Sequence, residues 1–506
     1  MSSRFGAVIL PLLLSGLPLA ADVKLPAVIS DHMLLQRGTP ARIFGWAEPG
    51  ESVTVQFHGQ THNTTTPANG RWQVWLNPLN AGDAGEMTIA GRNTLTVRDV
   101  LVGEVWVGSG QSNMQWALRQ TNNAETEARN ANYPQIRLFY VPRKTATEPQ
   151  DDVDAKWEIC TPETAAGFSA ILYLFGRDLN QHLKVPFGLI HTSWGGTPAQ
   201  AWASRAALSR DAALMPILGE WTKVLDAYPD AFTKYQRAMA DWDKAAKGGS
   251  DGPPRPGMPM GPGHSHQPSG LFNAMIYPIS KYTIKGAIWY QGETNATRIQ
   301  APLYQRLFET MIQDWRRQWE QGDFPFFWVQ LANFAKAGSP NDWVLVQEAQ
   351  AKTTELKATG MAVINDIGEP GDIHPKNKQD VAARLALVAR HVAYREDVVY
   401  RGPIFRQATT ETATTGDGGA KVRVWFDSVG GGLKARGGGG VKGFEVAGED
   451  KRFYPADARV DGATVVASSP NVTQPVAVRY AWASNPDANL INAEGLPAGV
   501  FRSVEW

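Results

Sequence analysis

The stretch Glu104-Val105-Trp106-Val107-Gly108-Ser109-Gly110-Gln111-Ser112-Asn113-Met114 decides the fold that we expect for this chain of 506 residues. Its first half is typical of a buried strand, and the Trp116-Ala117-Leu118 that follows is typical of a helix. In an α/β sheet, ligands bind beyond the carboxyl ends of the strands. Ser112 therefore lies where a substrate would arrive, and backbone N–H groups at a helix start can stabilise an oxyanion. A serine at a helix start is also a common N-cap, so this stretch alone leaves both roles open.

The same alternation of strand and helix continues from residue 101 to residue 399. Further buried strands are predicted at 185–192, 286–290, 326–331 and 361–367, and helices at 168–182, 304–318 and 380–394. This pattern predicts a largely parallel sheet that helices cover on both faces. An insertion at 203–268 interrupts it, with an amphipathic helix predicted for 203–247 and a Gly/Pro/Met-rich loop for 248–268. That loop is either a lid or substrate-binding loop near the site, or a plain surface loop.

The two flanking regions have β character. Residues 22–100 contain short alternating runs separated by turn signals, which predict a small β-sandwich-like domain. Residues 400–506 return to the same character, with a strand at 422–426. The first 21 residues combine Arg4, an apolar run and Ala20-Ala21, as a signal peptide does, so we expect a secreted or periplasmic protein. The apolar run is too short for a membrane anchor.

The composition excludes several classes of function. With 49 basic and 49 acidic residues the formal net charge is zero, so neither nucleic acid nor a membrane surface is an expected partner. Cys160 is the only cysteine, which rules out an intrachain disulfide and a cysteine-based zinc site, and we expect it to be buried. The 18 tryptophans are expected mainly in the core, although indole rings also stack on sugars.

Two polar clusters follow further predicted strands. Gly195 and Gly196 come after the strand at 185–192 and would let the backbone approach a ligand closely. Glu293 and Asn295 come after the strand at 286–290 and supply a carboxylate and an amide of the kind that oxyanion holes use. The alternatives are a plain strand-to-loop turn for the glycines and a glycosylation sequon for Asn295-Ala296-Thr297.

A candidate base lies in Gly371-Asp372-Ile373-His374-Pro375, after the last predicted strand and before a helix. An imidazole can take the proton of a serine hydroxyl near neutral pH, and an acidic group holds its tautomer. Of the nine histidines, His374 alone lies in a loop after a late strand beside an acidic residue. His191, which ends a strand beside the glycine pair, is its one rival, and we expect it to be structural.

These four clusters, in this order, resemble an SGNH-type hydrolase of the sialate O-acetylesterase family, which acts on acetyl esters of carbohydrates. Residues 25–37, 270–276, 443–448, 478–482 and 495–498 are similar to that family too, so the resemblance covers nearly the whole chain after the signal segment. It implies a three-layer α/β/α, flavodoxin-like core over 101–399, between the β regions 22–100 and 400–506. It also implies a serine esterase that removes O-acetyl groups from carbohydrates through an acetyl-serine intermediate, with no metal or organic cofactor.

The resemblance also implies roles for single residues. It makes Ser112 the nucleophile and His374 the base, and it assigns the oxyanion hole to the Ser112 amide, one of Gly195 and Gly196, and Asn295. The general pattern places this asparagine two residues after a glycine, whereas Asn295 comes three after Gly292.

The acid departs from the pattern as well. The usual position, three residues before the histidine, is Gly371 here, and Asp372 stands two before it. In an extended loop such an offset turns the side chain to the other side. Asp372 and Glu293 both remain candidates, and Asp366 is a third that better fits a hydrogen-bond anchor at a strand end.

Sialic acid and plant polysaccharides such as xylan or xyloglucan are the candidate substrates, and the oligomeric state is not indicated by the sequence. Two other functions compete with this hypothesis. One is a non-catalytic carbohydrate-binding protein on an esterase scaffold, and the other is an esterase of non-sugar esters. The presence of both Ser112 and His374 favours catalysis.

Overall fold

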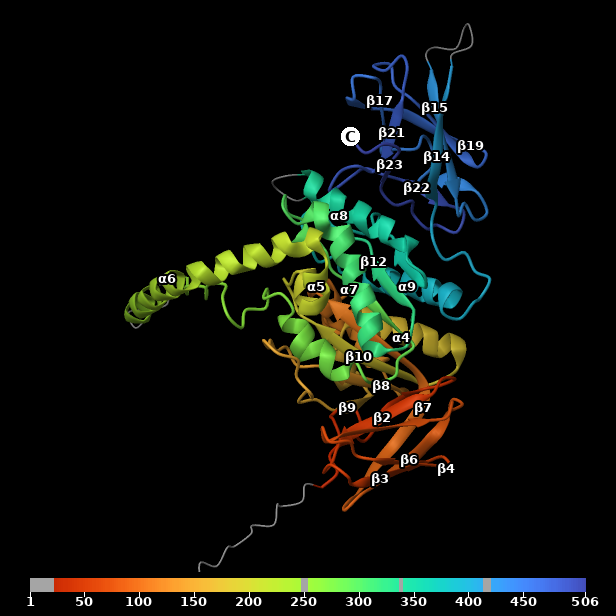
Figure 1. The fold of residues 1–506 in the computed structure, drawn as a ribbon. Coiled ribbons are helices and arrows are strands. Elements are labelled where there is room, and N and C mark those ends of the chain that lie inside the picture. Colours follow the sequence, from red (N-terminus) through yellow and green to blue (C-terminus); the bar gives the residue numbers. More distant parts are fainter. Residues whose placement is uncertain (1–21, 247–253, 336–339, 413–419) are drawn as a thin grey trace, which may run out of the picture.

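A computed structural model describes residues 22–246, 254–335, 340–412 and 420–506 (Figure 1). The predicted signal segment 1–21 and residues 248–253 of the predicted loop lie outside the described residues. Three regions follow one another along the molecule: an N-terminal β region, a central α/β region and a C-terminal β region (Figure 1). The expected mixed α/β fold with a large central sheet is confirmed.

The central region is built on a parallel sheet. Its strands lie in the order β8 (Tyr133–Tyr140), β10 (Phe187–Ser193), β7 (Thr94–Gly110), β11 (Gly286–Tyr290), β12 (Phe326–Val329) and β13 (Thr359–Ala362). An antiparallel strand, β9 (Trp157–Cys160), closes one edge. Gly110 is paired with both Ser193 and Tyr290, so the carboxyl ends of β7, β10 and β11 meet at one edge of the sheet.

Helices pack on both faces of this sheet. On one face α4 (Ala170–Leu183) and α9 (Lys378–Val392) contact each other and the strands β10, β12 and β13. On the other face lie α7 (Tyr304–Trp319) and, packed against it, α8 (Pro340–Lys352). The predicted helices at 168–182, 304–318 and 380–394 agree with α4, α7 and α9 to within two residues. The apolar spacing of these segments therefore sufficed to locate them.

Successive side chains along each strand point to opposite faces of the sheet, so each strand packs against the helices of both layers. Trp106 of β7 contacts Phe175 of α4 at 5.1 Å between ring centroids, whereas Trp289 of β11 contacts Trp315 of α7 at 6.0 Å. Many of the tryptophans are buried, as expected. The almost fully buried ones in the N-terminal and central regions are Trp72, Trp106, Trp157, Trp202, Trp289, Trp315, Trp319, Trp328 and Trp343. Cys160 is fully buried as expected, and burial raises the pKa of its thiol to about 12.

The N-terminal region is not separated from the centre by a linker. Its strands are β1 (Leu34–Gln36), β2 (Ala41–Trp46), β3 (Ser52–Phe57), β4 (Gln60–Thr65), β5 (Arg71–Leu76) and β6 (Gly82–Ala90). The strand β7 pairs with β6 through its first half and with β10 and β11 through its second half. The predicted division between residues 100 and 101 therefore falls inside one strand. It marks the point where a partly exposed strand becomes continuously buried, from Val100 onward.

The insertion forms an arm that projects from the central region (Figure 1). It contains α5 (Arg205–Arg210) and the long helix α6 (Met215–Ala246). After the arm the chain returns to the body, where His266 Nε2 lies 2.7 Å from the carbonyl oxygen of Gly196. The end of the insertion thus lies against the turn that follows β10. Of the helices within the described ranges, none is long and apolar enough to cross a membrane.

The C-terminal region contains two four-stranded antiparallel sheets with an apolar core of their own. One sheet comprises β14 (Ile404–Glu411), β15 (Lys421–Asp427), β20 (Thr464–Ser468) and β19 (Asp457–Asp461). The other comprises β18 (Phe453–Pro455), β17 (Phe444–Ala447), β21 (Ala477–Tyr480) and β23 (Phe501–Arg502), and β16 (Leu433–Ala435) pairs with β22 (Leu490–Asn492). Arg502 binds both carboxylate oxygens of Glu348 on α8, at 2.8 and 3.0 Å, and so ties this region to the centre.

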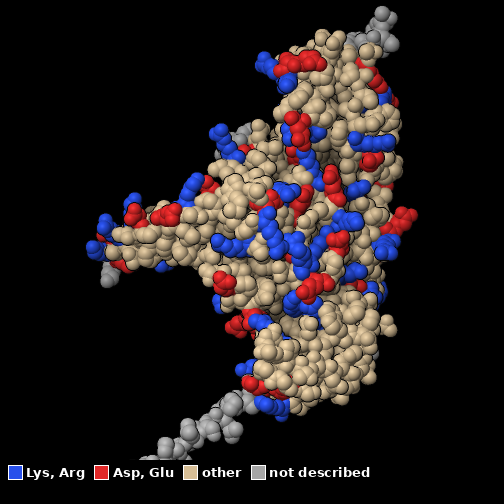
Figure 2. Space-filling model, in the orientation of Figure 1, with Lys and Arg blue, Asp and Glu red and all other residues tan. Residues whose placement is uncertain are grey.

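The face shown in Figure 2 carries acidic and basic side chains interspersed over the central region and α6. The N-terminal β region shows few charged side chains on this face. The absence of a nucleic-acid or membrane partner stays a prediction.

A buried ion pair in the loop after β13 leads to a prediction for stability. The Asp366 side chain is 6% exposed, binds Arg384 of α9 at 2.6 Å and contacts Arg436 of the C-terminal region at 2.7 Å. Removing one partner of a buried pair costs about 3–5 kcal/mol, because the other charge remains without compensation. We therefore expect Asp366→Ala to lower the free energy of unfolding by about 3 kcal/mol in urea denaturation.

The control is Asp427→Ala, because Asp427 forms an exposed pair with Arg406 at 3.9 Å. An exposed pair contributes at most about 1 kcal/mol. Equal stability of the two variants would contradict the anchoring role of Asp366.

Candidate active site

Ser112 is the first residue of a short helix, α1 (Ser112–Gln115), directly after β7. The turn depends on Gly110, whose φ is +136° and where a Cβ would lie 2.1 Å from the Tyr290 carbonyl oxygen. Only glycine allows this close approach. At the start of α1 the backbone N–H of Ser112 has no carbonyl within the helix to bind. The hydroxyl and this N–H therefore lie together at the carboxyl edge of the sheet.

His374 lies beside Ser112, although the loop that carries it follows β13. Its Nε2 is 2.8 Å from Ser112 Oγ, a hydrogen-bond distance. The Trp116 ring stacks on the imidazole, with 4.9 Å between centroids and 17° between planes. Burial and the positive charge of Lys378 lower the pKa of His374, against a smaller opposing effect of Asp372. The imidazole is therefore neutral near pH 7 and able to accept a proton.

The three acidic candidates lie in different surroundings. Asp372 Oδ1 is 3.7 Å from His374 Nδ1 and accepts a hydrogen bond from the His374 backbone N–H at 2.8 Å. Glu293 is buried, and no hydrogen bond or ion pair joins it to His374 among the residues described. Asp366 is occupied by its two arginines. Of the three, Asp372 has the carboxylate that faces the imidazole, at a distance too long for a hydrogen bond.

The two glycines of the turn after β10 lie differently. A Cβ on Gly195 would be 3.2 Å from Ser112 Cβ, so this backbone adjoins the candidate nucleophile. The Gly195 N–H donates to Gln115 Oε1 at 2.7 Å. Gly196 is exposed, has a φ of +73°, and presents its carbonyl to His266. Of the two glycines, Gly195 is thus the one whose backbone adjoins Ser112, and its N–H is bound by the Gln115 side chain.

The structure does not place Asn295 in the oxyanion hole as predicted. The residue is fully buried, and its Nδ2 donates to Gln200 Oε1 at 3.0 Å and to Gln300 Oε1 at 2.9 Å. Both amide hydrogens are therefore used inside the protein. The cause is the 3₁₀ turn Glu293–Asn295, which directs Asn295 inward. Its burial also leaves no accessible amide for the glycosylation that the sequon would allow.

Two residues beside the candidate nucleophile and base received no role in the sequence analysis. Asn113 is 1% exposed; its Nδ2 donates to Glu293 Oε1 at 2.7 Å and to the Ile373 carbonyl at 3.0 Å. Lys378 is fully buried at the start of α9 and donates from Nζ to Asn113 Oδ1 at 2.5 Å. Burial lowers the pKa of Lys378 to about 7 and raises that of Glu293. The sequence indicated them only by position, because Asn113 follows Ser112 directly and Lys378 lies soon after His374.

His191, the rival base, lies away from Ser112. It is 1% exposed, its Nε2 is 2.5 Å from Ser193 Oγ, and its ring packs between Tyr140 and Phe168. Burial lowers its pKa to about 3, so the ring is neutral at physiological pH. No contact joins it to Ser112 in the part of the chain that the structure describes, which fits the structural role expected for it.

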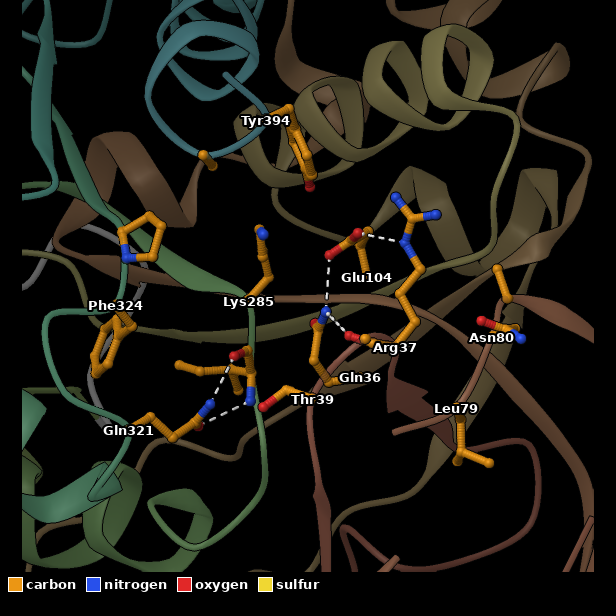
Figure 3. Close-up of a pocket in the computed structure, with 15 residues that line it drawn as sticks. Gln36, Arg37, Thr39, Leu79, Asn80, Glu104, Lys285, Gln321, Phe324 and Tyr394 are labelled. Atoms are coloured by element: carbon orange, nitrogen blue, oxygen red, sulfur yellow. Dashed lines mark hydrogen bonds and ion pairs between the residues drawn. The ribbon is translucent and has the colours of Figure 1, made fainter. Parts of the chain in front are cut away.

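A cavity of about 550 Å³ lies at the opposite end of the sheet (Figure 3). Its walls include Gln36, Arg37 and Lys285, and Glu104 pairs in register with Phe187, the first residue of β10. This is the amino end of the parallel strands, whereas ligands of such sheets bind at the carboxyl end. In addition, Glu104 is already bound by Gln36 and Arg37 (Figure 3). The cavity is therefore not part of the site around Ser112.

Comparisons with known proteins show the family of this chain. A family model described as carbohydrate esterase, sialic acid-specific acetylesterase, matches residues 264–387, which include Glu293, Asp372 and His374. The chain is 33% identical over 454 residues to the sialate O-acetylesterase of Mus musculus, which covers 79% of each chain. The chain belongs to the sialate O-acetylesterase family. The human sialate O-acetylesterase is likewise 33% identical, over 438 residues that cover 78% of this chain and 76% of the human one.

The crystal structure of a carbohydrate acetylesterase from Xanthomonas citri shares the architecture of this family member. It superposes with a TM-score of 0.81 at 39% identity, covering 96% of this chain and 100% of that one. The resemblance inferred from the sequence is thus confirmed, and this member of the sialate O-acetylesterase family is a carboxylic ester hydrolase.

A substitution at Gly195 tests the oxyanion site of this sialate O-acetylesterase family member. The added methyl group of Gly195→Ala would lie 3.2 Å from Ser112 Cβ and 3.3 Å from Gln115 Oε1, so Ser112 or the turn must move by a few tenths of an ångström. Misplacing an oxyanion donor costs about 10²-fold in kcat. We expect such a loss with 4-nitrophenyl acetate. Gly219→Ala, on α6 with nothing within 4 Å, is the control; unchanged kcat in Gly195→Ala would exclude Gly195 from the oxyanion hole.

Proposed function

We propose that this protein is a secreted serine esterase that removes O-acetyl groups from carbohydrates through an acetyl-serine intermediate. The observation that carries the proposal is the 2.8 Å contact between Ser112 Oγ and His374 Nε2 at the carboxyl end of β7. The activity named for its relatives, sialate O-acetylesterase or carbohydrate acetylesterase, supports the choice of acetyl ester.

The proposed reaction has two halves. Ser112 Oγ attacks the acetyl carbonyl carbon while its proton passes to His374 Nε2, and the resulting oxyanion accepts hydrogen bonds from the Ser112 and Gly195 N–H groups. The carbon–oxygen bond to the sugar then breaks, and the sugar oxygen takes the proton from His374. In the second half His374 takes a proton from water, which attacks the acetyl-serine. Acetate leaves, and Ser112 recovers its proton from His374.

We assign the acid of this triad to Asp372. Its carboxylate faces His374 Nδ1 at 3.7 Å and favours the imidazolium form, since it raises the pKa of that histidine. Hydrogen bonds of catalytic groups are often long without substrate and tighten in the reacting complex. Glu293 is instead bound by Asn113 and has no hydrogen bond or ion pair with His374 among the described residues.

We also propose that the central region has the three-layer α/β/α core of SGNH-type hydrolases. The strands β10, β7, β11, β12 and β13 are adjacent in that order, which is the 2-1-3-4-5 arrangement of flavodoxin-like sheets, with β8 and β9 added outside. The site lies at β7, where the strand order reverses. The proposed units are 22–100, 101–399 with the insertion 203–268, and 400–506, with β7 shared by the first two.

We propose that the returning part of the insertion, residues 254–268, forms one wall of the substrate site. Its His266 binds the carbonyl of Gly196, next to the proposed oxyanion donor. The substrate is an O-acetylated sugar, with sialic acid and acetylated plant polysaccharides such as xylan or xyloglucan as the two classes to compare. Export to the periplasm or the medium follows from the signal-like residues 1–21.

Ser112→Ala tests the proposed nucleophile. Without the hydroxyl no acetyl-serine forms, so we expect kcat for 4-nitrophenyl acetate to fall by at least about 10³-fold. Labelling by a fluorophosphonate probe should disappear in parallel. Near wild-type rates would refute the mechanism, and a wild-type protein that binds acetylated glycans without releasing acetate would be a carbohydrate-binding protein instead. A preference for longer acyl chains would indicate an esterase of non-sugar esters.

Asp372→Asn tests the proposed acid. The acid limb of the kcat/KM profile reports the pKa of His374 in the free enzyme, because the base must be neutral. Asp372 raises this pKa, so its neutralisation should lower it and move the acid limb to lower pH. We also expect a loss of roughly 10²-fold in kcat. If instead Glu293→Gln moved the limb and Asp372→Asn did not, Glu293 would be the acid.

A further inference from the structure

Lys378, Asn113 and Glu293 form a buried chain of polar groups behind the Ser112–His374 pair. Lys378 and Asn113 are 0% and 1% exposed, and Glu293 is 8% exposed. The chain runs from Lys378 Nζ to Asn113 Oδ1 at 2.5 Å and from Asn113 Nδ2 to Glu293 Oε1 at 2.7 Å. The same Nδ2 binds the carbonyl of Ile373, the residue before His374, at 3.0 Å.

The orientation of the Asn113 amide is set by its partners on both sides. An ammonium group has only donors, so the amide oxygen faces Lys378 Nζ. The amide nitrogen faces Glu293 Oε1 and the Ile373 carbonyl, which accept its hydrogen bonds. Without Lys378, the buried amide oxygen would lose the donor that holds it from its own side.

We propose that Lys378 is a positioning residue for this esterase: through Asn113 it fixes the loop that carries His374 and balances the buried Glu293 carboxylate. This inference rests on the function proposed above, and it adds a residue to which neither the sequence analysis nor the family relationship assigns a role.

The charge of Lys378 also acts on the base. The charged and titratable groups that face it are Glu293, Asp372, Glu369 and His374, and the rings of Trp116 and Tyr290 lie 5.8 and 5.6 Å from Nζ. The ammonium lowers the pKa of His374, which keeps the base neutral in mildly acidic solution. Because burial lowers the pKa of Lys378 to about 7, this effect weakens as the pH rises through that value.

Two substitutions separate the charge from the hydrogen bond. Lys378→Met removes both, whereas Lys378→Gln removes the charge and keeps an N–H donor for Asn113. Loss of a nearby positive charge raises the pKa of His374, so both variants should move the acid limb of kcat/KM upward by about one pH unit. A loop displaced by about 1 Å costs about 10²-fold, so kcat should fall by that factor in Lys378→Met and by less in Lys378→Gln.

The matched control is Lys376→Met, two residues before Lys378 in the loop that leads into α9 and exposed to solvent. It removes an equal charge and should leave the acid limb in place. An upward shift of the limb in both Lys378 variants but not in Lys376→Met supports the proposal. An unshifted limb in a folded Lys378 variant, checked by its melting temperature, overturns it.

A measurement without turnover separates this inference from the proposed function. In protein with labelled histidines, the NMR signal of His374, assigned with His374→Asn, should titrate at higher pH in Lys378→Gln than in the wild type. In the wild type the same signal should show a second inflection near pH 7, as Lys378 loses its proton. A wild type without esterase activity would refute the proposed function alone. An unshifted His374 signal in a folded Lys378→Gln protein, or a single inflection in the wild type where that variant does not fold, would refute the role of Lys378.

Discussion

The parallel pairing of β7 with β10 and β11 is the constraint on which the rest of the structure depends. It sets Gly110 opposite both Ser193 and Tyr290, so three loops start from one edge of the sheet. Each loop then supplies one part of the site: Ser112 after β7, Gly195 after β10 and Glu293 after β11. A shift of this register by one residue would turn every side chain of β7 to the other face of the sheet and move Gly110 away from the Tyr290 carbonyl, so the register fixes the site as well as the core.

That register does not by itself bring in the base, because His374 is 262 residues from Ser112 and comes from a loop after the edge strand β13. Further contacts hold this loop against α1. The Asn113 amide binds the Ile373 carbonyl, and the Asn122 N–H binds the Lys376 carbonyl at 3.1 Å. The Trp116 ring covers one face of the imidazole. Residues of the segment after β7 thus supply both the candidate nucleophile and the contacts that place its base.

Local patterns in the sequence predicted the elements whose positions depend on nearby residues. The strand-to-turn step at Ser112, the histidine loop and the helices α4, α7 and α9 follow from apolar spacing and turn residues, and the structure has them where they were expected. The turn at 293–295 directs Asn295 inward to Gln300, five residues on, and to Gln200, 95 residues earlier in the chain. The distant partner could not be inferred from the position of Asn295 after Gly292. The sequence also left open whether Asp372 or Glu293 is the acid, because separation along the chain does not give the distance in space from each carboxylate to His374. The sequence showed the boundary near residue 100 as a change from short alternating runs to strands alternating with helices. Only the pairing of β7 with β6, β10 and β11 shows that one strand continues through that boundary.

The cost of burying charge explains why Lys378, Asn113 and Glu293, which lie behind the site, bind one another. An isolated buried ion is costly, and removing one partner of a buried pair costs about 3–5 kcal/mol. Glu293 Oε2 has no hydrogen-bond partner in the described part of the chain, so the carboxylate relies on Asn113 and on the nearby positive charge of Lys378. Lys378 relies in turn on the Asn113 oxygen and on the carboxylates around it. Each group is therefore stabilised by the others. Through the bond from Asn113 to the Ile373 carbonyl, the network contacts the loop that places His374 2.8 Å from Ser112. In the mechanism proposed above, such preorganisation lowers the cost of reaching the transition state.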